Sequence, residues 1–156
     1  MLKAITLWEP YASLFSIGAK VNETRGVRTS HRGDICIHAA LKRHEFSPEF
    51  LRDVSTAFQK RGIKDGEFPF GCIVAVVDLW DVQPSTLFGW PGKDAPGNVF
   101  KITEEEYAFG NYTPGRWIYR TRNLRRLKVP VPCRGAQSIG WTVPPEVEKL
   151  VLEQLL

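Results

Sequence analysis

The sequence predicts an α+β fold, a small mixed β-barrel flanked by short helices, and three observations support this prediction. Strand-like apolar segments alternate with short helical segments along the chain. Turns rich in Gly and Pro connect these segments. The 156 residues contain no internal repeat and no linker long enough to divide them. We therefore expect one domain that spans residues 1–156.

The first half of the chain carries start and stop signals for two strands and two helices. Pro favours the first position of a helix, Ser is a preferred N-cap, and Gly often ends a helix. An acidic side chain such as Glu9 also favours the positive end of a helix dipole. The elements expected from these signals are a strand over 3–7, a helix opened by Pro10 and closed by Gly18, a strand over 35–40, and a helix from Ser47 to Gly62.

The second half is expected to supply the centre of the sheet. Residues 73–82 form the most apolar strand-like segment, which is typical of a strand buried on both faces. Gly and Pro are frequent over 83–97, which predicts a long surface loop. The other expected elements are a short helix capped by Thr103, a turn over 110–115, one or two strands over 116–131, and a C-terminal helix opened by Pro144 and Pro145 that docks through Val147, Leu150, Val151 and Leu155.

Composition argues against several classes of protein. No apolar run approaches the roughly 20 residues that a membrane-spanning helix needs. The N-terminus lacks the apolar core of a signal peptide. Three widely spaced cysteines, with no Cys-x-x-Cys, argue for a reducing setting and against a disulfide framework. We expect a cytoplasmic protein with neither a metal nor a cofactor, and we assume a monomer.

The segment 18–25 concentrates ionisable side chains directly behind the first predicted helix. Side chains alternate along an extended segment, so Glu23 and Arg25 should project to the same side, and Lys20 at the preceding turn can swing toward them. Three such groups are costly to bury unless they pair with each other or with a charged ligand. One interpretation is a solvated turn with a surface ion pair, and the other is the rim of a ligand site.

Asp78 is the strongest single signal from residue types, because it interrupts the apolar segment 73–77. A carboxylate in a buried strand needs a cation or several donors, or its pKa must rise. Lys20 and Arg25 are the candidate partners. Asp78 is therefore either a functional acid or one half of a structural Arg–Asp pair between two strands.

Two aromatic residues and one histidine have both structural and functional interpretations. His38 lies near the end of its strand, and the favoured interpretation is a half-buried side chain bonded to a backbone carbonyl. A metal pair with Cys36 would need further ligands from distant segments. Trp8 and Tyr11 are either part of the core, which is the default for a single aromatic side chain, or a stacking wall.

Seven basic residues and no acidic residue occur between 116 and 134, interleaved with Trp117 and Tyr119. Cations with aromatic side chains suit nucleic-acid backbones and unstacked bases. The alternative is a charged edge strand that prevents aggregation. The basic residues are Arg116, Arg120, Arg122, Arg125, Arg126, Lys128 and Arg134.

The order of these motifs resembles the ASCH domain family over nearly the whole chain. The first motifs are Leu7-Trp8-Glu9-Pro10-Tyr11-Ala12, Gly18-x-Lys20-x-x-Glu23-x-Arg25, and Arg32-Gly33-x-x-x-Ile37-His38-Ala39. The later motifs are the strand 71–78, Phe109-Gly110-x-Tyr112-x-Pro114-Gly115-Arg116-Trp117, and Val131-Pro132-x-Arg134-Gly135-x-Gln137.

The resemblance implies a PUA-like barrel with a cleft between the first helix and the barrel, lined by the segment 18–25. The family is associated with RNA binding, translation and coactivator functions, and some small members deacylate N4-acetylcytidine. By this resemblance Lys20 matches the catalytic lysine of those hydrolases. Glu23 departs from their pattern, because it stands where they carry a catalytic threonine. Glu9 stands where many relatives carry glutamine.

We predict that the chain binds RNA, another single-stranded nucleic acid or a modified nucleoside in this cleft. Lys20 and Arg25 are expected to contact phosphate or carbonyl oxygens. Glu23 and Asp78 are expected to orient these cations or to accept hydrogens from a base. The other expected binding residues are Trp8, Glu9, His38, Arg116 and Trp117.

Two alternatives belong to other functional classes. The chain could be a small hydrolase, either an amidohydrolase or a ribonuclease, with Lys20 as nucleophile or base activator and Glu23 and Asp78 beside it. These two carboxylates would raise the pKa of Lys20, which favours binding over catalysis. The loop 83–97 could instead make the chain a protein-interaction module.

Overall fold

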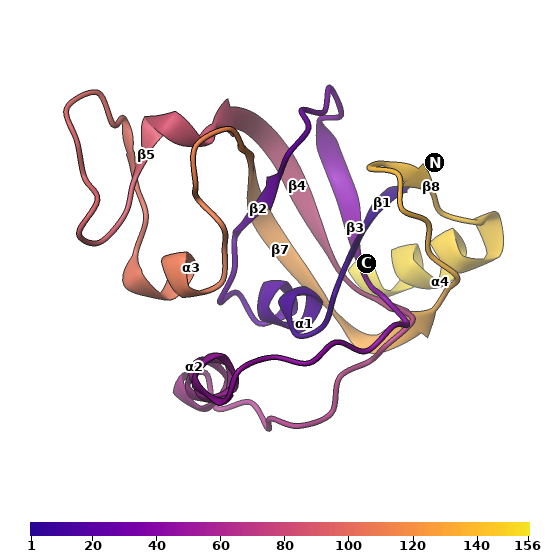
Figure 1. Ribbon diagram of the computed structural model, residues 1–156. Helices are drawn as coiled ribbons and strands as arrows, with labels where there is room; N and C mark the ends of the chain where they lie inside the picture. Colours follow the sequence, from indigo (N-terminus) through magenta and orange to yellow (C-terminus); the bar gives the residue numbers. More distant parts are fainter.

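A curled six-stranded sheet lies at the centre of the protein, which the computed structural model describes over residues 1–156 (Figure 1). The strand order across this sheet is β2-β7-β4-β3-β1-β8. β1 and β3 are parallel, and the other neighbouring strands run antiparallel. The strands are β1 (Lys3–Leu7), β2 (Asn22–Arg25), β3 (Gly33–Ala39), β4 (Cys72–Pro84), β7 (Trp117–Pro132) and β8 (Trp141–Thr142).

Four helices and a small two-stranded sheet surround the central sheet. Figure 1 shows α2 below it, α4 at its right, and α3 with β5 at its left. None of the helices combines the length and the apolar character that crossing a bilayer requires. The elements are α1 (Tyr11–Ser16), α2 (Pro48–Lys60), a 3-10 helix (Ser85–Leu87), β5 (Phe88–Gly89), β6 (Phe100–Lys101), α3 (Glu104–Ala108) and α4 (Pro145–Leu155).

The predicted α+β class is confirmed, and the sheet curls into a half-barrel flanked by short helices. The predicted start of α2 is confirmed, because the Ser47 hydroxyl accepts a hydrogen bond from the Phe50 amide at 3.1 Å. The predicted strand near residues 116–131 is present as one long strand, β7. Two predicted details are wrong: α1 begins at Tyr11, one residue after Pro10, and the segment 83–97 contains the end of β4, a 3-10 helix and β5.

Alternation along the strands divides the core between the two faces of the sheet. Ala75, Val77 and Leu79 of β4 face α1 and pack in one cluster with Phe15. Val76 faces the opposite side, where the apolar side of α4 covers the sheet. Between the irregularities of β4, over residues 75–79, a side chain therefore faces either α1 or α4 according to its parity, which decides whether it can reach the segment 18–25.

The short helix α1 should be held mainly by its buried side chains, because six residues form too few hydrogen bonds to be stable alone. Phe15 is 1% exposed, so Phe15→Ala is expected to lower the free energy of unfolding by about 3–5 kcal/mol in urea denaturation.

Leu150 of α4 provides the control for this measurement. The sequence predicts that it docks on the barrel, but it is 50% exposed, because Val147 and Val151 are the α4 side chains buried against the sheet. Leu150→Ala should change the free energy of unfolding by only about 0.5 kcal/mol or less. Equal losses in both variants would contradict the packing described here.

Candidate functional site

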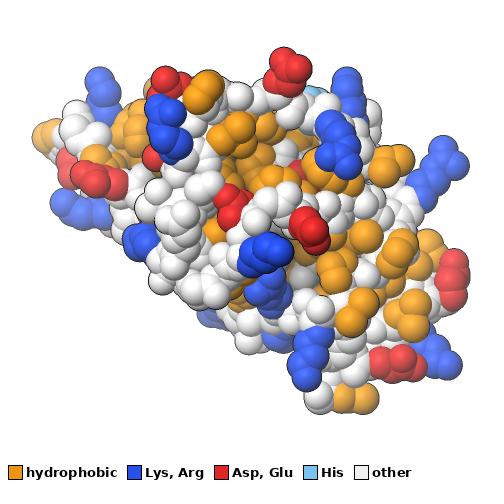
Figure 2. Space-filling model, turned by 90° about the horizontal axis from the view of Figure 1, so that it is seen from below, with side chains coloured by type: hydrophobic (Ala, Val, Ile, Leu, Met, Phe, Trp, Pro, Cys, Tyr) orange, Lys and Arg blue, Asp and Glu red, His pale blue; other side chains and the backbone are white.

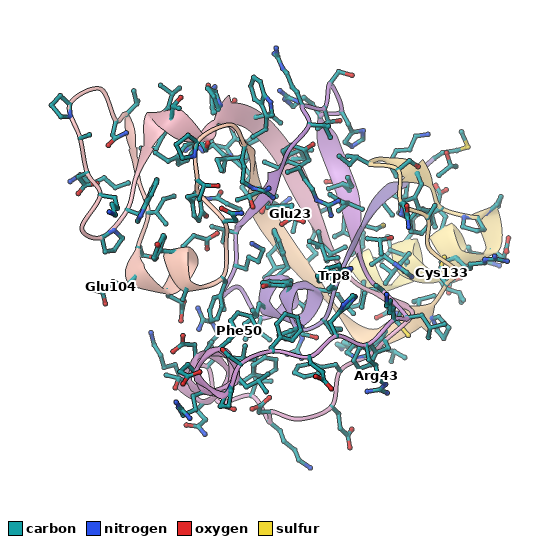
Figure 3. The ribbon with its side chains drawn as sticks, in the orientation of Figure 1. Trp8, Glu23, Arg43, Phe50, Glu104 and Cys133 are labelled. Carbon is teal, nitrogen blue, oxygen red and sulfur yellow. The ribbon has the colours of Figure 1, made fainter.

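A cleft with a volume of about 480 Å³ opens between α1, β2 and the segment that follows α3. Its walls come from parts of the chain that are far apart in sequence. Trp8, Glu23 and Phe50 all line this cleft, and Phe50 lies below the other two in the view of Figure 3. The charged residues that line it are Lys20, Glu23, Arg25 and Arg116. Four of the residues predicted for the site therefore meet in one cleft with Trp8.

The end of α1 directs Lys20 into the protein. Gly18 has a positive φ of 80°, a conformation that glycine adopts readily and that ends many helices. The amides of Ala19 and Lys20 then both donate to the carbonyl of Leu14, at 2.9 and 3.1 Å. This turn reverses the chain, so that the Lys20 side chain enters the interior instead of extending into solvent.

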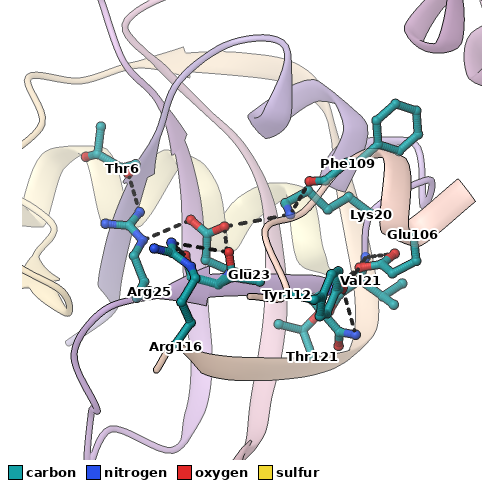
Figure 4. Close-up of polar contacts among 12 residues, drawn as sticks. Thr6, Lys20, Val21, Glu23, Arg25, Glu106, Phe109, Tyr112, Arg116 and Thr121 are labelled. Atoms are coloured by element: carbon teal, nitrogen blue, oxygen red, sulfur yellow. Dashed lines mark hydrogen bonds and ion pairs between the residues drawn. The ribbon is translucent and has the colours of Figure 1, made fainter. Parts of the chain in front are cut away.

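The Lys20 ammonium group is buried, with only 2% of the side chain exposed. Its Nζ donates to the carbonyl oxygen of Phe109 at 2.7 Å and lies 3.7 Å from Oε1 of Glu23 (Figure 4). Burial lowers the pKa of Lys20, while the carboxylates of Glu23 and Glu106 oppose this shift and Arg25 adds to it. The charged form of Lys20 is therefore less favoured in this site than the charged form of a lysine in water.

Glu23 links Lys20 to Arg25, and Figure 4 shows it between them. Its Oε2 accepts from Nε of Arg25 at 3.0 Å. Arg25 also donates through Nη2 to the carbonyl of Thr6 at 2.9 Å, which ties β2 to β1. The prediction that Glu23 and Arg25 project to the same side is confirmed, because alternation along β2 places both side chains in the cleft.

Arg116 adds a third cation to the cleft wall. Its Nη2 donates to the carbonyl of Thr24 at 2.8 Å, which fixes the guanidinium beside β2. Its Nε is buried and has no hydrogen-bond partner. A buried donor without an acceptor costs free energy, so the Arg116 side chain is held in the cleft wall with one hydrogen-bonding group unsatisfied. The neighbouring Trp117 is not on the cleft wall and packs on the core, with Arg28 5.3 Å above its ring.

Glu106 is a buried acid behind the cleft that the sequence analysis did not identify. Its carboxylate accepts hydrogen bonds from the amides of Val21 and Asn22 and from the hydroxyl of Tyr112. Burial raises the pKa of Glu106, and these donors together with Lys20 oppose the shift. Glu106 belongs to the acidic first turn after Thr103, a pattern that by itself predicts only the start of a helix.

Trp8 and Glu9 are neighbours with different environments. Trp8 is 52% exposed and stacks on His44, with the ring centroids 3.6 Å apart. Glu9 is buried and accepts from the amide and the hydroxyl of Ser13, at 2.8 and 2.6 Å. The structure therefore places Glu9 at the start of α1, as its helix-dipole role predicts, and not on the cleft wall.

The predicted pairing of Asp78 with Lys20 or Arg25 is wrong. Asp78 lies opposite Arg122 in the register of β4 and β7, and its Oδ2 accepts from Nε of Arg122 at 2.8 Å. Its parity along β4 is that of Val76, so it points to the α4 side, away from the cleft. Asp78 is a structural partner between two strands, which was the alternative interpretation.

The basic residues of 116–134, which have no acidic neighbour within their own segment, are partly compensated by acids on other strands. Acids on β3 and β4 lie within reach of three β7 arginines, and the pairs are Arg120–Asp81, Arg122–Asp78 and Arg125–Asp34. The hydrogen bonds from Arg125 lower the pKa of Asp34. Lys and Arg side chains are likewise scattered among acidic and hydrophobic ones on the face shown in Figure 2. The long strand is therefore not a continuous basic surface.

His38 lies on the opposite side of β3 from the cleft-facing core. It is buried, and its Nε2 is 2.7 Å from the carbonyl oxygen of Cys133 while its Nδ1 is 3.1 Å from the Thr6 hydroxyl. The favoured interpretation, a histidine bonded to a backbone carbonyl, is confirmed. Cys36 is buried beside β4, and its pKa is raised to about 12 by burial.

The buried ammonium group makes the stability of the chain depend on pH. Because the pKa of Lys20 is lowered by folding, the unfolded chain binds more protons just below the ordinary lysine pKa of about 10.4. Stability from this group therefore rises with pH in that range. We expect the unfolding free energy of the wild type minus that of Lys20→Met to increase as pH rises toward about 10.4.

The exposed Lys93 gives the matched control, because Lys93→Met removes the same charge without a buried partner. Urea unfolding at a series of pH values measures both differences. If the unfolding free energy of the wild type minus that of Lys20→Met stays constant or falls as pH rises, the buried environment assigned to Lys20 is contradicted.

Comparisons with known proteins relate this arrangement to a family. No family model matches the chain. The chain is 26% identical over 149 residues to activating signal cointegrator 1 of Mus musculus and, equally, to that of Homo sapiens. The match covers 93% of this chain and 23% of each relative, so the chain spans about a quarter of their length.

A solved structure shares the fold. The crystal structure of a point mutant of the ZmASCH protein from Zymomonas mobilis aligns with a TM-score of 0.51 and 18% identity, covering 96% of this chain and 95% of that one. Together, the sequence similarity to the cointegrators and the shared fold support placing this chain in the ASCH domain family.

Proposed function

We propose that this chain binds RNA, or a modified nucleotide, in the cleft beside α1. The observation that carries the proposal is the charge of the cleft wall, where three cations meet and Glu23 is the one acid. The cations are Lys20, Arg25 and Arg116. An excess of positive charge on a concave surface favours an anionic ligand.

The cleft offers specific positions for the parts of a nucleotide. Arg116 is fixed by the Thr24 carbonyl, and Arg25 is fixed by Glu23 and Thr6, so both guanidinium groups are oriented before a ligand arrives. These two groups would receive phosphate or carbonyl oxygens. Glu23 would accept hydrogens from a base, and the buried Lys20 would hold Glu23 in position.

Aromatic side chains surround these polar groups. Trp8 at the rim is half exposed, and Tyr11 and Phe50 line the wall with their ring centroids 5.5 Å apart. Aromatic faces stack on unpaired bases, and a volume of about 480 Å³ lies within the usual range for sites of small organic ligands. The association of ASCH domains with RNA agrees with this proposal.

The compartment expected from composition is part of the same proposal. All three cysteines are free thiols, which suits a reducing cytoplasmic setting in which RNA is also present.

The salt dependence of RNA binding tests the role of Arg116. Each phosphate contact contributes about 0.7 to the slope of log affinity against log salt for a single strand. Arg116→Gln should therefore weaken the binding of a fluorescein-labelled mixed-sequence RNA 12-mer and reduce that slope by about 0.7. Fluorescence anisotropy at several salt concentrations measures both quantities.

Arg52→Gln is the matched control, since Arg52 is exposed on α2 and lies outside the cleft. It should change neither the affinity nor the slope. RNA binding by the wild type that is insensitive to salt, or equal losses in both variants, would contradict the proposed site.

A second candidate function, hydrolysis, is favoured by the lowered pKa of Lys20. A neutral amine can act as nucleophile or general base, and burial increases its neutral fraction. Asp78, one of the two carboxylates expected to oppose this shift, lies on the other face of the sheet. Glu106 takes that opposing role instead, so the lysine remains coupled to two acids.

Turnover assays separate the two candidates. We expect no release of cytidine from a panel of N4-acylated cytidines and no cleavage of labelled RNA by the wild type. Turnover that is present in the wild type and lost in Lys20→Ala would replace the binding proposal with a hydrolase.

A further inference from the structure

A second and larger cavity, with a volume of about 1120 Å³, adjoins the cleft. Its walls come from the end of β3 and the residues after it, from the start of β4, and from the segment that follows β7. Thr6, Trp8 and Arg25 line both cavities. The two cavities are therefore neighbours that meet at these three residues.

The wall of the second cavity carries positive charge only. No Asp or Glu lines it, whereas Arg25, Lys42 and Arg134 do. Lys42 and Arg134 are exposed and form no ion pair, unlike the paired arginines of β7. A cavity lined by three cations, two of them unpaired, and by no acid is complementary to a phosphodiester backbone.

Trp8 stands at the boundary between the two cavities. Figure 3 places it between Glu23 in the cleft and Cys133 in the second cavity. The indole is supported from one side by His44, stacked 3.6 Å away with an interplanar angle of 22°, and the side chain is 52% exposed. A supported, exposed ring between two cationic cavities is suited to stack on a base.

His38, which lines the second cavity, is held in a fixed position. His38 contacts Thr6 and Cys133 through its two ring nitrogens. Gly135 lies so close to it that an added Cβ would be 2.4 Å from the imidazole Cε1, so a side chain there would displace the histidine. Because both ring nitrogens of His38 are engaged, this histidine contributes shape rather than a free donor or acceptor to the cavity.

We propose that the two cavities form one channel for single-stranded RNA, which passes across Trp8. One nucleotide occupies the cleft, and the adjoining nucleotide occupies the second cavity, where Lys42 and Arg134 contact its phosphate. This inference rests on the proposed function and adds that the recognised ligand is an oligonucleotide rather than a single nucleotide.

The test compares short ligands of different length. A mixture of the four nucleoside 5′-monophosphates and a mixed-sequence RNA tetranucleotide pool compete against the labelled RNA 12-mer in an anisotropy assay. The wild type should bind the tetranucleotides about tenfold or more tightly than the monophosphates, because a second stacked base and a second phosphate are engaged.

The double variant Lys42→Gln/Arg134→Gln alters only residues of the second cavity. It should lose most of the tetranucleotide advantage, roughly tenfold, while its affinity for the monophosphates stays unchanged. Arg52→Gln/Lys93→Gln removes the same charge from exposed positions outside both cavities and should retain the advantage.

The outcomes separate this inference from the proposed function. Monophosphates and tetranucleotides that bind equally, or a double variant that behaves like its control, would overturn the channel and leave the cleft as a mononucleotide site. Displacement of the labelled RNA by an acidic peptide as effective as the tetranucleotides would also overturn it. No binding of the labelled RNA at all would overturn both the channel and the proposed function.

Discussion

Burial of the Lys20 ammonium group is the constraint on which the arrangement of this protein depends. A buried cation is costly unless nearby groups compensate it. The compensation comes from the Phe109 carbonyl, from Glu23 on β2 and from Glu106 on α3. These contacts hold the end of α1, the edge strand β2 and the segment after α3 together around one point. The cleft lies where these three elements meet, so the contacts of Lys20 determine both the shape and the charge of the cleft.

The curled sheet separates structural charges from the charges that are available to a ligand. On the α4 side, Asp34 and Asp78 are neighbours in register, and arginines from β7 pair with both. These pairs fasten β7 across β4 and β3 and leave little net charge there. Within and beside the cleft, cations outnumber acids, and the lining of the second cavity contains no acid at all. The net charge of +4 is thus less informative than its distribution over the two faces.

Local features could be predicted from the sequence, whereas features that depend on strand register could not. The N-cap at Ser47 and the shared side of Glu23 and Arg25 follow from capping preference and strand alternation, which involve neighbouring residues only. The partner of Asp78 depends on how β7 pairs with β4, and bulges shift that register. Glu106 reaches Asn22 across 84 positions, a distance at which the sequence carries no pairing signal. The second cavity was missed for the same reason, because its walls come from separate segments.

Two-dimensional NMR of the uniformly 15N-labelled chain, titrated with mixed-sequence RNA, tests the central claim most directly. The account predicts that the largest changes in amide chemical shift occur over residues 20–25 and 108–111, which surround the buried lysine, while α4 and the paired arginines of β7 remain unchanged. Shifts confined to α4 or to the paired arginines of β7, with none around Lys20, would contradict it.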